Sequence, residues 1–148
     1  MIRRTMWPCT LATALVVLTG CHTTSVPNRE GRSDTRVHYL EIVCGDVDEQ
    51  CAAMERVHGL SFGPGVADLG GARVAEAPGG SRIGVRAPLA AHEPPIIRTY
   101  LAVDDIAKAV MEAEAAGAMI AYPPTEQGDT GTWAIYMLGG VQVGLWQR

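Results

Sequence analysis

Short runs of alternating apolar and polar residues recur along the chain, in the pattern of half-buried β-strands. One run covers residues 37–44 (VHYLEIVC), and a similar run covers residues 96–103 (IIRTYLAV). Each run is followed by apolar residues at helical spacing. Because side chains alternate along a strand and repeat every 3.6 residues along a helix, each half of the chain is predicted to begin with a strand and then a helix.

Both predicted helices carry residues that favour helix ends. The first is expected to begin at Asp46 and to end at Gly59, and the second to begin at Asp104 or Asp105 and to end at Gly117. An aspartate side chain accepts hydrogen bonds from the free N–H groups of the first turn, and glycine readily adopts the left-handed conformation that ends a helix. These signals set the boundaries of both helices.

Three more short strands are predicted after each helix. They fall around residues 60–62, 72–77 and 82–87 in the first half, and 119–122, 132–138 and 141–146 in the second. The segment GGSRIGV at 79–85 returns as GGVQVGL at 139–145, so a Gly-Gly turn precedes the last strand of each half. The chain is therefore predicted to contain one α+β domain, residues 36–148, built from two tandem βαβββ units, 36–90 and 96–148. A linker with Pro94 and Pro95 joins them.

The alternation also separates the two faces of the predicted strands. One face is almost purely apolar and should pack against the helices; it carries Leu40, Ile42, Cys44, Ile83, Val85, Thr99, Leu101, Val103, Val141, Val143 and Leu145. The opposite face is polar and aromatic, with Tyr39, Glu41, Arg82, Gly84, Arg86, Arg98, Tyr100, Gln142, Gly144 and Trp146. This second face is where a ligand would bind.

The tandem βαβββ order, with the segment YLAVDDI (100–106) opening the second unit, resembles the vicinal oxygen chelate superfamily, which includes glyoxalases, bleomycin-resistance proteins and extradiol dioxygenases. The resemblance implies a cup with helices outside and the ligand inside. Metal-using members place their ligands on the first and last strand of each unit, and the matching positions here are Tyr39, Gly84, Arg98 and Gly144. Glycine offers no ligand atom and arginine repels a cation, so we expect no metal and no cofactor.

The cup-facing residues are instead predicted to bind a small organic ligand, anionic or aromatic. Arginine binds carboxylate or phosphate in a bidentate manner, and tyrosine and tryptophan provide stacking faces. The central glycines of the repeat, Gly84 and Gly144, are expected to leave space for the ligand, and either Trp133 or Tyr136 could join the site. The candidate ligand-binding residues are Tyr39, Glu41, Arg82, Arg86, Arg98, Tyr100, Gln142 and Trp146.

Two other functions are compatible with the same residues. The domain could be a metal-independent lyase, isomerase or hydroxylase-like enzyme, with Glu41 or Tyr39 as the acid or base. It could also be a dimeric interaction module, because members of the superfamily commonly form dimers. The resemblance does not choose among these functions, since the superfamily contains both enzymes and binding proteins.

The first 20 residues are predicted to be a signal peptide. Arg3 and Arg4 precede an apolar stretch that is too short to cross a membrane, and the LTGC sequence ending at Cys21 resembles the lipobox of bacterial lipoproteins. Cys21 would then be lipidated, and the polar segment to residue 35 would be a flexible tether about 20 Å long. The protein is expected in the bacterial cell envelope, attached to a membrane through Cys21.

Charge and the remaining cysteine and histidine residues narrow the picture further. The net charge of −4 becomes −6 once Arg3 and Arg4 leave with the signal peptide, so nucleic acid is not an expected partner. Cys44 and Cys51 are expected to be free thiols, although export would permit a disulfide between them. His38 is expected to point toward the helices or a strand edge, and would take the place of Tyr39 if the strand were shifted by one residue.

Overall fold

The computed structural model describes residues 35–148. The predicted signal peptide, the lipidation site Cys21 and nearly all of the tether lie outside the described residues. Within residues 35–148, neither helix has the length and apolar character needed to cross a membrane. The fold is therefore that of the predicted domain alone.

The first unit contains a helix and four strands. Its elements are β1 (Val37–Val43), α1 (Val47–His58), β2 (Gly65–Val66), the short 3₁₀ helix η1 (Ala67–Leu69), β3 (Ala72–Glu76) and β4 (Arg82–Arg86). Asp46 caps α1, its side chain accepting a 2.9 Å hydrogen bond from the backbone N–H of Glu49, and Gly59 ends the helix with φ of 67°. Both predicted ends of this helix are confirmed.

The second unit repeats this order. Its elements are β5 (Ile96–Ala102), α2 (Ile106–Ala115), β6 (Met119–Glu126), the 3₁₀ helix η2 (Gly128–Thr130), β7 (Thr132–Leu138) and β8 (Val141–Gln147). Of the two candidate caps, Asp105 is the one used, and its carboxylate accepts from the N–H of Lys108. Helix α2 ends at Ala115, and Gly117 follows with φ of 87°.

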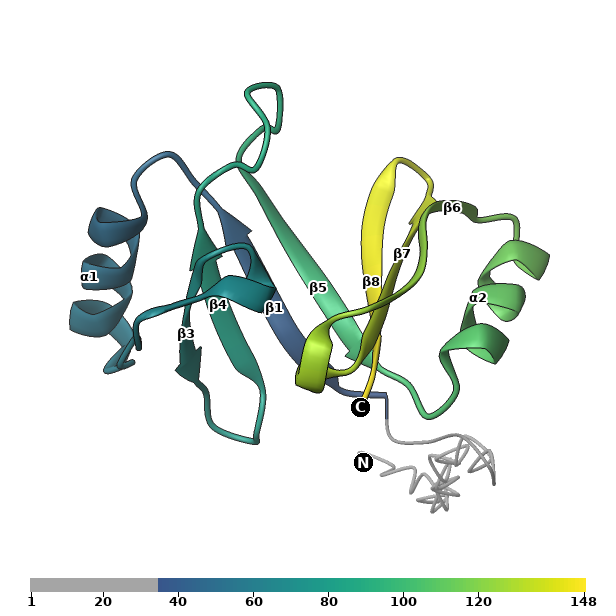
Figure 1. The fold of residues 1–148 in the computed structure, drawn as a ribbon, viewed down its shortest axis with the longest axis horizontal. Helices are drawn as coiled ribbons and strands as arrows, with labels where there is room; N and C mark the ends of the chain where they lie inside the picture. Colours follow the sequence, from purple (N-terminus) through teal and green to yellow (C-terminus); the bar gives the residue numbers. More distant parts are fainter. Residues whose placement is uncertain (1–34) are drawn as a thin grey trace, which may run out of the picture. The chain divides into compact units, whose positions relative to one another are not determined.

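The strands of both units form one sheet in the order β2-β3-β4-β1-β5-β8-β7-β6. Strand β1 runs parallel to β4 and β5 runs parallel to β8, while β1 and β5 join the units as antiparallel neighbours. In Figure 1, β1 and β5 lie centrally and the two helices lie toward opposite ends. The prediction of an α+β domain of two tandem βαβββ units that forms a cup is confirmed.

Two strand predictions need correction. Residues 60–62 form no strand, and the corresponding strand is the short β2 at 65–66. The backbone N–H of Phe62 donates to the Glu55 side chain instead of to a neighbouring strand. Strand β6 extends beyond the predicted residue 122 through Pro123 and Pro124, which an edge strand tolerates because it has a strand on one side only.

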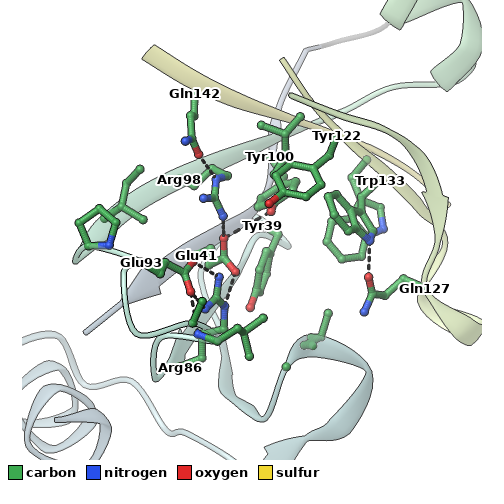
Figure 2. A pocket seen from close by; sticks show the side chains of 18 of the residues that line it. Tyr39, Glu41, Arg86, Glu93, Arg98, Tyr100, Tyr122, Gln127, Trp133 and Gln142 are labelled. Carbon is green, nitrogen blue, oxygen red and sulfur yellow. Dashed lines mark hydrogen bonds and ion pairs between the residues drawn. The ribbon is translucent and has the colours of Figure 1, made fainter. Parts of the chain in front are cut away.

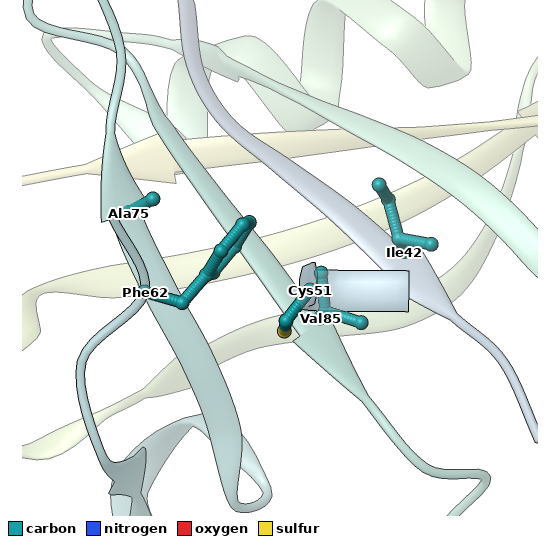
Figure 3. Close-up of a cluster of buried hydrophobic side chains, with 5 residues drawn as sticks. All are labelled: Ile42, Cys51, Phe62, Ala75 and Val85. Carbon is teal, nitrogen blue, oxygen red and sulfur yellow. The ribbon is translucent and has the colours of Figure 1, made fainter. Parts of the chain in front are cut away.

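The apolar face of the strands packs under the helices as predicted. In the first unit, the buried side chains between α1 and the sheet are Ile42, Cys51, Phe62, Ala75 and Val85 (Figure 3). Ile106, Ala134 and Leu145 form the matching cluster of the second unit. Each large aliphatic side chain buried in this way contributes about 1.5–3 kcal/mol, so the helices hold the sheet in place from outside. Cys44 and Cys51 are free thiols, as expected.

Candidate functional site

A cavity of about 420 Å³ lies on the polar and aromatic face of the sheet. Strands of both units and the linker between the units contribute to its lining, and its volume is within the usual range for small-molecule sites. All but one of the eight predicted ligand-binding residues line this cavity. They are Tyr39, Glu41, Arg86, Arg98, Tyr100, Gln142 and Trp146, and the exception is Arg82.

Glu41 is the centre of a buried ion-pair network (Figure 2). One of its carboxylate oxygens accepts a 2.7 Å hydrogen bond from Nε of Arg86, and the other accepts from Nη1 of Arg98. The hydroxyl of Tyr100 also donates to this second oxygen, at 3.3 Å. Glu41 and both arginines are at least nine-tenths buried, so each charge is stabilised by its ion-pair partners in place of water.

The arginines make further contacts that complete the network. Nε of Arg98 donates to Oε1 of Gln142 at 2.9 Å. Arg86 forms a bidentate pair with Glu93, through Nη1 and Nη2 at 2.9 and 2.7 Å. Of the three arginines predicted to bind an anionic ligand, Arg86 and Arg98 are thus already paired with the carboxylates of Glu41 and Glu93.

Glu93 comes from the linker between the units and anchors that linker against the cavity. Its carboxylate also accepts a 2.7 Å hydrogen bond from the backbone N–H of Leu89. The hydrogen bonds from Arg86 lower the pKa of Glu93 from 4.5 to about 2. Because Leu89 lines the cavity too, the Arg86–Glu93 pair positions one wall of the site.

The Arg86–Glu93 pair predicts a specific loss of stability in acid. The pKa of Glu93 is lower in the folded state than in the unfolded chain, so its stabilisation is present above about pH 4.5 and is lost as the pH falls toward 2. Each pKa unit corresponds to about 1.4 kcal/mol, so we expect Glu93→Gln to lower the free energy of unfolding by roughly 2–3 kcal/mol at pH 7.

Urea denaturation of the two proteins at several pH values between 7 and 2 measures this difference. The gap between the wild type and Glu93→Gln should shrink steadily below pH 4.5. Glu112→Gln is the control, because Glu112 is exposed on α2. A gap that stayed constant with pH would show that the effect of Glu93 is steric and not electrostatic.

An aromatic cluster forms the second part of the cavity wall. Tyr39, Tyr100 and Trp146 are buried together, with ring centroids between 5.5 and 5.7 Å apart. Trp133 joins them edge-on to Tyr100 at 6.5 Å, and its indole N–H donates to Oε1 of Gln127. Burial, and then the negative charge of Glu41, raise the pKa values of Tyr39 and Tyr100, so both phenols keep their protons.

The two central glycines do not leave open space, contrary to the prediction. A Cβ atom at Gly84 would overlap the side chain of Tyr39, and one at Gly144 would overlap the ring of Tyr100. Each glycine therefore admits a tyrosine ring that lies directly on the backbone of the neighbouring strand. The repeated glycines serve to seat the aromatic wall, and the cavity lies beyond it.

His38 and Arg82 lie together outside the cavity lining. The register between β1 and β5 shifts between Val37 and Tyr39, and this irregularity places His38 against cup-face residues. Its ring lies 5.5 Å from that of Trp146, and its Nε2 lies 3.1 Å from Nη2 of Arg82. The predicted orientation of His38 toward the helices or a strand edge is wrong. Burial and the nearby charge of Arg82 lower the pKa of His38 to about 4.

The residues at the superfamily's metal positions do not fit a divalent ion. The tyrosine rings cover the two glycines, and the third position, Arg98, is held by Glu41. Both oxygens of the buried Glu41 carboxylate already accept hydrogen bonds from guanidinium groups. Within residues 35–148, no three His, Cys, Asp or Glu side chains gather as a metal site requires.

Several residues of the cavity were missed by sequence reasoning. Glu93 and His92 belong to the linker and Leu89 lies just before it, in a stretch that carries no periodic pattern that would place it over the cup. Gln127 and Tyr122 lie on the irregular stretch around η2 and on the extended strand β6. For Trp133 the alternation left two options on one strand. The structure brings Trp133 into the cavity and packs Tyr136 against the buried cluster beneath α2.

The chain has a glyoxalase-like α+β fold of two tandem βαβββ units. Among solved structures, the chain resembles a hypothetical protein from Bacillus halodurans (TM-score 0.64, 15% identity, covering 78% of this chain and 96% of that one). It also resembles methylmalonyl-CoA epimerase from Mycobacterium tuberculosis (TM-score 0.60, 18% identity, 76% and 87% covered). A Streptomyces coelicolor epimerase variant in complex with 2-nitronate-propionyl-CoA is similar as well (TM-score 0.57, 15% identity, 77% and 97% covered). No protein-family model and no curated protein matches the sequence.

Proposed function

We propose that the protein is an exported, lipid-anchored binding protein whose cup takes a small organic molecule with an aromatic or conjugated body. The observation that carries this proposal is the cavity of about 420 Å³, walled by Trp133, Tyr100 and Trp146. Aromatic faces bind flat apolar rings through dispersion and edge-to-face contacts. The fold is compatible with a binding role, but one fold can host many functions, so the fold alone does not identify the function.

A binding role is favoured over the enzymatic alternative by the state of the two candidate catalytic groups. Hydrogen bonds from Arg86, Arg98 and Tyr100 occupy three of the roughly four lone-pair positions of the Glu41 carboxylate, which leaves little room for it to take a substrate proton. Tyr39 has a raised pKa and holds its proton. Methylmalonyl-CoA epimerase shares the fold at 18% identity, which is too distant to transfer its activity.

Anchoring and dimer formation stay predictions. The lipobox-like sequence at Cys21 supports attachment to a membrane of the bacterial cell envelope. Fractionation of cells that express the full chain tests this part of the proposal, with recovery in the membrane fraction as the supporting result. A homodimer would bury part of the exposed apolar surface at Ile97, Leu138 and Val141.

Ligand-dependent thermal stabilisation tests the binding role. A compound that binds the folded state at 100 times its Kd should stabilise it by about 2.7 kcal/mol, which a thermal-shift screen of aromatic metabolites detects. We expect Trp133→Leu to weaken the best ligand about tenfold, because it removes an aromatic wall of the cavity.

Tyr136→Leu is the matched control, since Tyr136 lies on the same strand, does not line the cavity and packs with the cluster beneath α2. It should lower stability and leave affinity unchanged. Turnover of a bound compound without stabilisation, or equal losses of affinity in both variants, would contradict the proposal.

A further inference from the structure

Three arginines lie at one end of the sheet, outside the cavity lining, and form what we call the basic end. Arg36 precedes β1, Arg82 begins β4 and Arg148 follows β8. Because β1 runs parallel to β4 and antiparallel to β5, and β5 runs parallel to β8, the starts of β1 and β4 lie at the same end as the close of β8. The N–H of Ala102 donates to the carbonyl of Arg36 at 2.9 Å, and Ala102 also pairs with Trp146. Figure 1 shows the C-terminus beside the start of β1.

The charges of the basic end are not neutralised by ion pairs. The cavity arginines are paired with glutamates, whereas none of the three arginines of the basic end forms an ion pair within residues 35–148. Glu76 is the cross-strand neighbour of Arg82. The guanidinium of Arg82 lies instead 5.8 Å from the ring centroids of Tyr39 and Trp146. The aromatic rings hold this charge in place without cancelling it.

The buried ring of His38 lies within reach of all three charges. Its Nε2 is 3.1 Å from Nη2 of Arg82, and since arginine can only donate, Nε2 accepts this hydrogen bond and the ring is neutral. Burial, and then the charges of Arg82, Arg148 and Arg36, lower the pKa of His38 to about 4. Positive charge is thus concentrated at the basic end, although the chain that follows the predicted signal peptide is acidic overall.

We propose that the basic end docks the domain on the anionic phospholipid surface of the membrane that holds Cys21. This inference rests on the proposed lipid anchor and adds an orientation of the domain on the membrane. The predicted tether that leads from Cys21 ends at residue 35, next to Arg36. The end of the sheet to which the tether connects is therefore the basic one. The tether sequence adds Arg29 and Arg32 between the anchor and the domain.

The spacing of the arginines suits a lipid surface better than a single small anion. Strands β4 and β8 are separated by β1 and β5, and neighbouring strands lie about 4.8 Å apart, so the basic end is about 14 Å wide. Headgroups present many negative charges over such a width. Electrostatic attraction acts over about 8 Å at physiological ionic strength, so Arg82 contributes although it is only partly exposed. Each arginine near such a surface strengthens docking about fivefold, or about 1 kcal/mol.

Energy transfer from tryptophan to the bilayer surface tests this docking. The mature chain, whose tryptophans are Trp133 and Trp146, is inserted through its own lipid into phosphatidylcholine vesicles. Phosphatidylglycerol is either absent or about a third of the lipid, and a dansyl-labelled headgroup is the acceptor. We expect stronger transfer in the anionic vesicles. Arg36→Gln combined with Arg148→Gln should lower the ratio of docked to undocked domain about 25-fold, at about fivefold for each arginine.

Arg56→Gln combined with Lys108→Gln is the matched control. Both residues are exposed on the helices, and the control loses the same charge, so it should retain the transfer of the wild type. Equal losses in the two double variants, or equal transfer in the two kinds of vesicle, would overturn the inference alone. Loss of transfer on adding inorganic phosphate at constant ionic strength would also overturn it, by showing a site for a single anion. A mature chain that did not insert into vesicles would overturn the inference together with the proposed anchor.

Discussion

Replacing Glu41 with leucine is expected to lower the free energy of unfolding by about 3–5 kcal/mol, the largest effect of any single substitution in the cup. Glu41 is 7% exposed, and its carboxylate is hydrogen-bonded to Arg86, Arg98 and Tyr100. Its removal leaves the guanidinium groups of Arg86 and Arg98 buried without this negative partner. A buried charge that has lost its partner costs far more free energy than the loss of one hydrogen bond.

Denaturant unfolding of the wild type and Glu41→Leu measures this loss. Asp48→Asn breaks the exposed pair between Asp48 and Arg73, whose atoms lie 2.9 Å apart, and should cost less than about 1 kcal/mol. The comparison separates buried from exposed ion pairs of similar length. A loss of under 1 kcal/mol for Glu41→Leu would mean that the arginines find other partners or water, and that the network does not hold the cup together.

Gly144→Ala is expected to cost about 1–3 kcal/mol and to weaken ligand binding, although it adds a single methyl group. The new Cβ would overlap the ring of Tyr100, which lies directly over the glycine and is 5% exposed. The ring cannot move without disturbing Trp146 and Trp133, whose rings pack edge-on against it. Overpacking of this kind forces side chains away from favourable rotamers.

The matched control is Gly45→Ala. Gly45 has no atom within 4 Å of an added Cβ and does not have a positive φ, so alanine should be neutral or slightly stabilising there. Thermal unfolding and ligand titration of both variants test the expectation. If Gly144→Ala left both stability and affinity unchanged, the tyrosine ring could not be seated as the structure places it, and the glycine would have no packing role.

Much of the fold was predictable because it depends on local signals. The strand over 37–43 follows from the alternation of apolar and polar residues, and the helix from Asp46 to Gly59 follows from a capping side chain and a terminating glycine. Each of these signals depends only on residues that are close in the sequence. The same alternation assigned Tyr39, Glu41, Arg86 and Arg98 to one face, and the structure places all of them on the cavity. A period of two is a property of the strand backbone and needs no tertiary information.

The failures occurred where side chains from different strands compete for the same space. Alternation shows that Gly84 and Tyr39 face the same side of the sheet, but it does not show that the ring lies over the glycine. One irregularity in the register of β1 was enough to turn His38 onto the other face. The linker was equally unpredictable, since Glu93 reaches Arg86 through an irregular turn, in which the N–H of Glu93 donates to the carbonyl of Ala90, and no periodic pattern marks that turn.

By itself, the sequence determined the two repeated units, the face that each strand presents and the residue types available to the cup, because these depend on backbone periodicity and capping. Only the tertiary structure decided how those residues are used. It paired Arg86 and Arg98 with Glu41 and Glu93, seated Tyr39 and Tyr100 on the central glycines, and left the Tyr39 hydroxyl without a hydrogen-bond partner among residues 35–148. Such pairings depend on distances between residues far apart in the chain, and a linear pattern contains no information about those distances.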